Sequence, residues 1–163
     1  MQLLDELIVG DTYQPDRSPP LLIGPDAGFA AIVQRLARQP ELRGTFVVDD
    51  EQRLLGVITR GDLLDWSRAQ LGASLQAPFK GVEETLRLAS LINASKVGQV
   101  MHANSNKAAV KKDSSLAHAL RLMVELDLIV LPVVDRYDRV IGEVRLSDIL
   151  ARALEGDPKN AIG

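Results

Sequence analysis

Two short stretches of the sequence combine polar residue types at a spacing that could do chemistry. The first runs from Gly56 to Asp62 and places Thr59 three residues before the aspartate, at the expected start of a helix. A hydroxyl group and the free amides of a helix N-terminus can donate hydrogen bonds to an anionic group, and an ionised carboxylate can accept two. The same Thr-x-x-Asp spacing also resembles a capping box, which stabilises a helix without any ligand. Ligand contact and capping are both open for Thr59 and Asp62.

The second stretch, from Gly142 to Asp148, keeps the glycine and the aspartate but has Arg145 where the first stretch has Thr59. An arginine side chain can bind a phosphate through its paired N–H groups. It can equally pair with a carboxylate at a domain interface or extend into solvent. Phosphate binding, an ion pair and a solvated charge are all open for Arg145.

Other kinds of chemistry find little support. The chain contains no cysteine, which excludes disulfides, thiolate metal sites, iron–sulfur clusters and cysteine nucleophiles. Its two histidines, His102 and His118, do not have the spacing of a metal-binding pair, and His118 is expected at the surface. A nucleophile elbow, a Walker phosphate loop and a dinucleotide fingerprint are all missing from the sequence. We predict no catalytic residue and no metal site, so an enzyme is the weaker hypothesis.

The composition of the 163 residues, 46% hydrophobic and 25% charged, is typical of a globular protein. A net charge of −3 and a pI near 5.4 disfavour a nucleic-acid partner, because duplex binders usually carry a basic face. The longest uncharged apolar run, Leu128 to Val134, is far shorter than the roughly 20 residues that span a membrane. Asp5 and Glu6 stand where a secretory signal would be basic. We expect a cytoplasmic protein with no membrane partner.

The elements that must position the two stretches occur twice along the chain. An offset of 86 residues relates Asp49 to Asp135, Gly56 to Gly142 and Asp62 to Asp148. Further upstream, apolar positions with helical spacing at 29–36 recur at 116–123, and Val9-Gly10 resembles Val97-Gly98. Almost the whole chain is therefore two copies of one unit.

Each unit is predicted to run strand, helix, strand, strand, helix. In the second copy we expect a short strand at 107–110, a helix capped by Asp113 or Ser114, strands at 129–135 and 140–144, and a helix from Ser147 through Leu154. In the first copy the hairpin turn is expected at 50–53 and the return strand at 54–58. Between the copies, 72–81 is typical of a linker and 82–93 of an extra helix, with Leu88, Leu91 and Ile92 on one face. The segment 11–20 is expected to be a loop.

This ordered set resembles the cystathionine-β-synthase (CBS) domain family. The resemblance is carried by 131–135, 140–142 and 148–150 in the second copy, by 47–49 and 56–64 in the first, and by the lead-in 97–101. It implies an α/β fold in which two β-α-β-β-α repeats, related by a pseudo-twofold axis, form a Bateman module with two clefts between facing sheets. The expected domains are 1–70 for the first repeat with its lead-in, 71–95 for the linker with its helix, 96–157 for the second repeat and 158–163 for a polar tail.

The resemblance also assigns candidate ligand-binding residues. The family contacts nucleotides through Gly-apolar-apolar-(Thr/Ser)-x-x-Asp, which the first copy matches at Gly56, Thr59 and Asp62, and the aspartate suits the vicinal hydroxyls of a ribose. In the second copy the candidates are Asp148, the departing Arg145 and Pro132, which stands at the family's proline position.

Three further features are each compatible with two interpretations, a ligand-binding role or a structural role. Phe46 takes the place of the family's proline in the first copy, where it packs either against a ligand base or in the core. Lys107, Lys111 and Lys112 form a small basic cluster that either faces a phosphate or is a solvated edge. The acidic run 49–51 is expected to be an exposed hairpin turn and not a metal site.

The function that the resemblance implies is that of a regulatory module. We expect a homodimer that holds no cofactor, binds an adenine nucleotide such as AMP or ATP as a regulatory ligand, and relays binding to an unknown effector protein by rearranging its repeats or protomers. The alternatives are a structural or dimerisation module with empty clefts, and a CBS pair that binds S-adenosylmethionine.

Overall fold

The computed structural model of the protein describes residues 3–12, 20–72, 81–156 and 159, and it confirms the predicted α/β fold class with two repeats. The first repeat contains β1 (Leu22–Ile23), α1 (Phe29–Arg38), β2 (Gly44–Val48), β3 (Leu54–Thr59) and α2 (Arg60–Leu71). The second contains β4 (Val110–Lys111), α4 (Leu116–Leu126), β5 (Val130–Val134), β6 (Val140–Arg145) and α5 (Leu146–Glu155). Between them lies α3 (Gly81–Ala94), and the 3₁₀ turns are η1 (Val9–Asp11), η2 (Val97–Gln99) and η3 (Ser105–Lys107).

Two predicted boundaries in the second repeat are wrong. The strand expected at 107–110 is replaced by the two-residue β4, because Ser105 is buried and starts the 3₁₀ turn η3, which extends through Lys107. Helix α4 is capped by Ser115, whose Oγ accepts a hydrogen bond from the backbone N–H of His118 at 3.0 Å. Asp113 and Ser114, which the sequence suggested as caps, lie in the turn before it.

The two repeats have the same sheet topology. In each sheet the short first strand is parallel to the central strand, and the central strand is antiparallel to the third. The register is also repeated, since Val47 faces Gly56 in the first sheet and Val133 faces Gly142 in the second, with an irregularity at the next residue in both. The duplication seen in the sequence is therefore a duplication of backbone geometry.

Each central strand is buried on both faces. In β2, Val47 packs with Ile32 and Leu36 of α1, whereas Phe46 and Val48 belong to a larger cluster that contains core residues of β5 and β6. Because side chains alternate along a strand, one face of the sheet serves the repeat's own helix and the other serves the second repeat. The repeats thus share a hydrophobic core.

The lead-in segments are exchanged between the repeats. The turn η1 lies against the second repeat, where the N–H of Val9 donates to the carbonyl of Ser114 at 2.8 Å. The turn η2 lies against the first repeat, where the N–H of Val97 donates to the carbonyl of Ala27 at 2.9 Å. Each repeat is therefore completed by the segment that precedes the other one in the chain.

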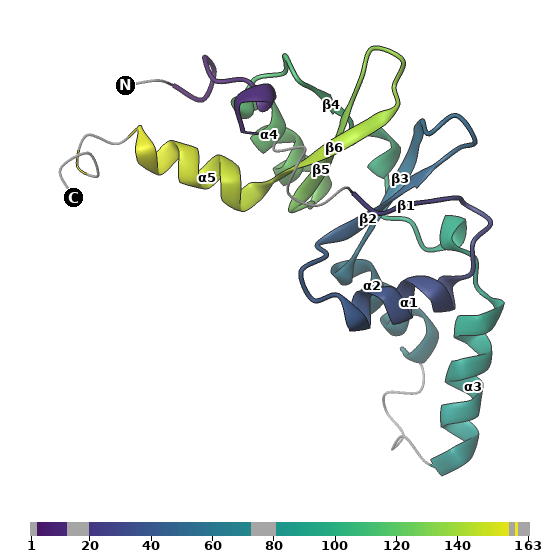
Figure 1. Ribbon diagram of the computed structural model, residues 1–163. Helices are drawn as coiled ribbons and strands as arrows, with labels where there is room; N and C mark the ends of the chain where they lie inside the picture. Colours follow the sequence, from purple (N-terminus) through teal and green to yellow (C-terminus); the bar gives the residue numbers. More distant parts are fainter. Residues whose placement is uncertain (1–2, 13–19, 73–80, 157–158, 160–163) are drawn as a thin grey trace.

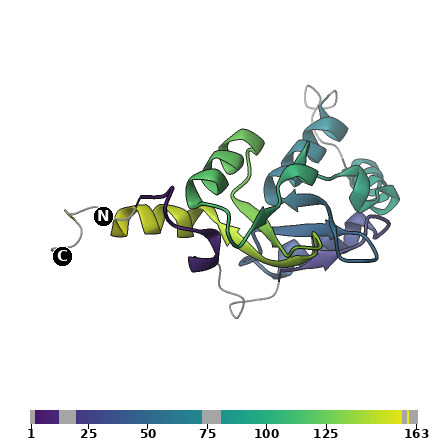
Figure 2. The same cartoon turned by 90° about the horizontal axis from the view of Figure 1, so that it is seen from above.

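The sheets lie side by side at the centre of the molecule, with α3 and α5 at opposite ends (Figures 1 and 2). Helix α3 confirms the extra helix expected at 82–93; it packs beside α1 and its Leu88, Leu91 and Ile92 are half-buried. The expected linker 72–81 and loop 11–20 fall largely outside the described residues, as does most of the tail 158–163. Within the described ranges, none of the helices has the length and apolar character needed to cross a bilayer.

Candidate functional site

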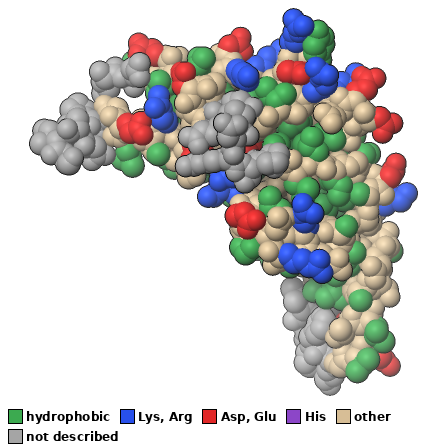
Figure 3. All heavy atoms as spheres, in the orientation of Figure 1, with side chains coloured by type: hydrophobic (Ala, Val, Ile, Leu, Met, Phe, Trp, Pro, Cys, Tyr) green, Lys and Arg blue, Asp and Glu red, His purple; other side chains and the backbone are tan. Residues whose placement is uncertain are grey.

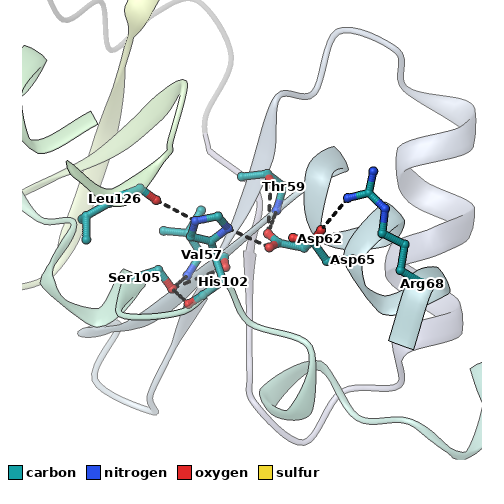
Figure 4. Close-up of polar contacts among 8 residues, drawn as sticks. All are labelled: Val57, Thr59, Asp62, Asp65, Arg68, His102, Ser105 and Leu126. Carbon is teal, nitrogen blue, oxygen red and sulfur yellow. Dashed lines mark hydrogen bonds and ion pairs between the residues drawn. The ribbon is translucent and has the colours of Figure 1, made fainter. Parts of the chain in front are cut away.

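Asp62 lies in the first turn of α2, which follows β3 without a loop. Thr59 is the last residue of β3 and the N-cap of α2, so its extended backbone turns the chain directly into the helix. The backbone N–H of Thr59 donates to Oδ2 of Asp62 at 2.6 Å, and its hydroxyl lies 3.0 Å from the same oxygen (Figure 4). Asp62 is only 5% exposed. The structure therefore shows the capping role that the Thr-x-x-Asp spacing allowed, and ligand contact stays a prediction.

The other carboxylate oxygen of Asp62 contacts a histidine from the second repeat's lead-in. Nδ1 of His102 lies 2.7 Å from Oδ1 of Asp62, and Nε2 lies 2.6 Å from the carbonyl oxygen of Leu126 (Figure 4). A carbonyl and an ionised carboxylate only accept hydrogen bonds, so both ring nitrogens are placed to donate. The arrangement suits the protonated imidazolium form of His102.

The surroundings of His102 favour its charged form. Burial of the ring opposes protonation, but the hydrogen bonds to Asp62 and to the Leu126 carbonyl, with the negative charges of Asp62 and Asp127, outweigh it and raise the pKa of His102 above its usual value of 6.5. His102 therefore connects the two repeats, because Asp62 belongs to α2 of the first repeat and Leu126 ends α4 of the second.

The loop that carries His102 is fixed against the edge of β3. The N–H of His102 donates to the carbonyl of Val57 at 2.8 Å, and the buried Ser105 hydroxyl accepts from the N–H of Val57 at 2.9 Å. Gly56 makes this approach possible, because a Cβ at that position would lie 2.5 Å from Sδ of Met101. In the structure Gly56 therefore positions the loop, whatever role it has toward a ligand.

A cavity of about 450 Å³ opens between the repeats beside the start of α2. Its wall is formed by Thr59 to Gly61, by the loop 40–43 and, from the second repeat, by Asp127 and Ile129. The side chain of Arg60 is occupied, because it donates to the carbonyls of Gln39 and Leu42 at 2.8 and 3.0 Å. Thr59 is thus the predicted site residue that borders the cavity, while Asp62 lies behind it.

The candidates of the second repeat are arranged differently. Arg145 is the N-cap of α5, and its Nη2 lies 3.4 Å from Oε1 of Glu143 in the same strand, so the ion pair forms within β6 and not with a residue across a domain interface. Asp148 is half-buried in the first turn of α5, and among the described residues it makes no capping contact like that of Asp62. Pro132 is buried in β5 opposite Glu143. The structure therefore brings Thr59 and Asp62 into one polar arrangement, with Gly56 making room for the loop of His102, and does not do so for Pro132, Arg145 and Asp148.

Sequence reasoning missed the role of His102. It is separated from Asp62 by 40 positions, and no local spacing connects the two residues.

Phe46 is 1% exposed within the shared core, which fits the core alternative. Among the described residues, no group of three or more histidine, aspartate or glutamate side chains could hold a metal ion.

Comparison with known proteins agrees with this architecture. The CBS domain family matches the chain twice, at residues 11–69 and 97–155. The crystal structure of the CBS-pair protein CBSX2 from Arabidopsis thaliana superposes with a TM-score of 0.68 at 26% identity, over 91% of this chain and 95% of that chain. A crystal structure of CBSX2 in complex with AMP has a TM-score of 0.64 at 25% identity, over 91% and 97% of the two chains.

A CBS domain-containing protein from Thermotoga maritima has a TM-score of 0.71 at 22% identity, over 93% of this chain and 97% of that chain. No curated protein matches the sequence. Since the family matches cover both repeats, we conclude that the chain belongs to the CBS domain family as a tandem pair, the Bateman module that its internal duplication predicts.

Proposed function

We propose that this CBS pair is a regulatory module of the cytoplasm that binds an adenine nucleotide, AMP or ATP, in the cleft between its repeats. The observation that carries the proposal is the cavity of about 450 Å³ beside Thr59, whose wall comes from both repeats. This volume lies within the range of roughly 300–1,000 Å³ that is usual for small-molecule sites. The AMP complex of CBSX2, which is 25% identical to this chain, supports the choice of ligand.

Residues at the start of α2 can supply the recognition chemistry. The N–H groups at the N-terminus of α2, bordered by Gly61, offer donors to a phosphate, and the Thr59 hydroxyl can donate to it by releasing Asp62. The Asp62 carboxylate lies directly behind them and is the acceptor suited to ribose hydroxyls. Exposed Arg43 lines the cavity wall and adds a positive charge. The site is therefore polar at one end and bounded by Leu42 and Ile129 elsewhere.

Ligand binding would be relayed because the cavity spans two repeats. A ligand shifts a conformational equilibrium only by its different affinity for the two states. A nucleotide that contacts α2 of the first repeat and the 127–129 segment of the second favours one relative placement of the repeats. An effector protein would read that placement.

We further propose that the module acts as a homodimer. Apolar side chains are exposed on helices of both repeats, including Leu64 of α2, Val124 of α4 and Leu150 of α5. A twofold dimer would cover such surfaces and is the most common homo-oligomer. Sedimentation at tens of micromolar should give about twice the 17.8 kDa chain mass, and a mass near 17.8 kDa would contradict it.

One observation favours the alternative of a structural module with empty clefts. Both oxygens of Asp62 already have partners within the chain, so the helix cap needs no ligand. Thermal unfolding with AMP, ADP, ATP and S-adenosylmethionine separates the two functions. At one hundred times its dissociation constant, a bound ligand adds about 2.7 kcal/mol. For this chain length that corresponds to a rise in Tm of roughly 5–11 °C. If no adenine ligand raises the Tm, the structural function is favoured.

A further inference from the structure

Asp62, the carboxylate proposed to receive the ribose, is already held by another group. We call the set of His102, Asp62 and the Leu126 carbonyl the clasp. The His102 and Asp62 side chains are 14% and 6% exposed, and both ring nitrogens lie within 2.7 Å of an acceptor. The imidazole ring lies against Oδ1 of Asp62 (Figure 4), so a ribose hydroxyl that takes the same position must displace the ring.

We infer that His102 competes with the ligand for Asp62, so that a nucleotide binds the first cleft only when the clasp opens, and that protonated His102 keeps the clasp closed. This inference rests on the proposed function. The charged groups that face the ring are Asp62 from α2 and Asp127 at the end of α4, and both are anionic. Loss of the imidazolium proton removes their attraction, so a rise in pH weakens the clasp.

The clasp also connects binding to the arrangement of the repeats. It links α2 of the first repeat to the end of α4 in the second, and the cavity beside Thr59 is bounded by the same two regions. Opening the clasp therefore removes a polar link between the repeats at the moment when the ligand adds its own contacts. If the open state has a population of roughly 1–10%, the apparent affinity is about 10- to 100-fold below its intrinsic value.

The test compares AMP affinity across pH 6–9 in wild type, His102→Ala and His118→Ala. His118 is exposed on α4, so its variant is the matched control. Wild type and His118→Ala should bind AMP more tightly as the pH rises. His102→Ala should bind about 10- to 100-fold more tightly at pH 6 and lack this dependence beyond the titration of AMP itself. His102→Asn, which keeps a donor but no charge, guards against misfolding of the alanine variant and should also lose the dependence.

The outcomes are distinguishable. Weaker binding by His102→Ala and His102→Asn, or affinity that falls with rising pH in wild type, would overturn the competition while leaving the nucleotide site intact. Absence of AMP binding in every variant at every pH would overturn both the inference and the proposed function. Because the chain has two histidines, NMR titration of wild type, His118→Ala and Asp62→Asn reads the clasp directly. A pKa of His102 that does not fall in Asp62→Asn would overturn the clasp itself.

An independent observation concerns the hairpin of the second repeat, at the far end of β6 from Arg145. A cavity of about 650 Å³ is lined there by four cations, two carboxylates and the Tyr137 ring; the cations are Lys111, Lys112, Arg136 and Arg139, and the carboxylates are Asp113 and Asp135. Lys and Arg side chains gather at this tip of the molecule (Figure 3). The guanidinium carbons of Arg136 and Arg139 lie 4.7 and 5.1 Å from the centre of the Tyr137 ring. Asp135 offsets the charge of Arg139 through an ion pair at 3.0 Å, and an anion beside Arg136 would offset the second guanidinium charge near the ring.

The first repeat serves as an internal reference for this surface. Its hairpin keeps the supporting ion pair, since Arg53 binds Asp49 at 2.9 Å as Arg139 binds Asp135 at 3.0 Å. The positions around the pair differ in charge. The residues equivalent to the two lysines, Arg136 and Tyr137 are Gly24, Pro25, Asp50 and Glu51. The scaffold is therefore retained while the surface changes from acidic to basic, in a chain whose net charge is −3.

We propose that this basic cavity binds a small polyphosphate anion, separately from the nucleotide cleft. Arg and Lys side chains are the usual partners of phosphate groups, and the Arg136 guanidinium stacked on Tyr137 is held in place to donate. The ligand is either free inorganic polyphosphate or the phosphate tail of a nucleotide, which share this chemistry.

Calorimetric titration with inorganic triphosphate at low salt tests the site. The double variant Lys111→Gln with Arg136→Gln should lose about tenfold or more in affinity, whereas Arg38→Gln with Arg68→Gln removes the same charge elsewhere and should bind normally. Asp62→Asn should leave triphosphate binding unchanged, and ATP binding more tightly than triphosphate at this cavity would identify the nucleotide as the source. Equal losses in the two double variants, or no triphosphate binding by wild type, would overturn the site.

Discussion

The two repeats have the same backbone but treat their equivalent aspartates differently. Asp62 caps α2, is almost fully buried and is joined to His102, whereas Asp148 at the start of α5 is half-buried and lacks both the cap and a described histidine partner. The complete burial of the central strands is retained in both copies, and so is the sheet register. The difference teaches that the fold depends on the apolar pattern, while a few polar substitutions decide which copy has the buried aspartate with its cap and histidine partner.

The largest expected effect comes from the core position at which the copies differ most. Phe46 is buried in the shared core where the second copy has Pro132. Phe46→Ala should lower the free energy of unfolding by about 3–5 kcal/mol, because it leaves a cavity between the repeats. Chemical denaturation measures this. A loss below about 1 kcal/mol, together with weaker AMP binding, would instead favour a ligand-packing role for Phe46.

The next largest effect should come from removing the charge of each equivalent aspartate, because the loss of stability should differ between the two repeats. Asp62→Asn leaves the His102 imidazolium without its carboxylate and should cost roughly 1.5–3 kcal/mol of stability, the usual scale for a hydrogen bond to a charged group. Asp148→Asn breaks no such contact among the described residues and should change stability by less than about 0.5 kcal/mol. Equal losses in urea unfolding would contradict the difference between the repeats.

A smaller effect is expected at Gly56, where the loop of His102 meets β3. Gly56→Val should cost about 1–3 kcal/mol, because its side chain would enter space held by Met101 and Ser105. Gly61→Ala is the control, since its Cβ would be in ordinary contact with Thr59 at 3.5 Å. Guanidinium unfolding should show a clear loss for the first variant alone, and a similar loss for both would argue against close packing of the loop.

The smallest effect is a dependence of apo stability on pH. The pKa of His102 is raised in the folded state. The stabilisation that protonated His102 provides is therefore complete below the unfolded-state pKa near 6.5, and it is lost as the pH rises through the folded-state pKa. The Tm of wild type should therefore fall in this range by more than that of Asp62→Asn. Parallel Tm profiles for the two proteins would show that the clasp does not contribute.

The sequence predicted the fold well because the fold depends on local, repeated patterns. The offset of 86 residues, the helical spacing at 29–36 and the apolar strands indicated both repeats and their order. The Thr59–Asp62 cap was also foreseeable, since capping depends on residues three positions apart. The contact of His102 with Asp62 was not, because it arises from the exchange of lead-in segments and has no signature in local spacing.

The gathering of cations around Tyr137 was only half visible in the sequence. The sequence groups Lys111 and Lys112 with Lys107 in one basic cluster, but Lys107 does not line this cavity. The other two lysines lie at the end of β4, whereas Arg136 and Arg139 follow β5. Parallel pairing of β4 with β5 places the ends of these strands together. Such a surface becomes predictable only when the register of the sheet is known.

Calorimetric titration of AMP into wild type, Asp148→Asn, and His102→Ala with and without Asp62→Asn tests the central claim, that the first cleft is the nucleotide site of this duplicated chain. The account predicts one tight site per chain in wild type and near-normal binding in Asp148→Asn. In the His102→Ala background, where no clasp forms, adding Asp62→Asn should lose roughly 1.5–3 kcal/mol of binding free energy. Two equal sites per chain in wild type, or undiminished binding when Asp62→Asn is added to His102→Ala, would contradict it.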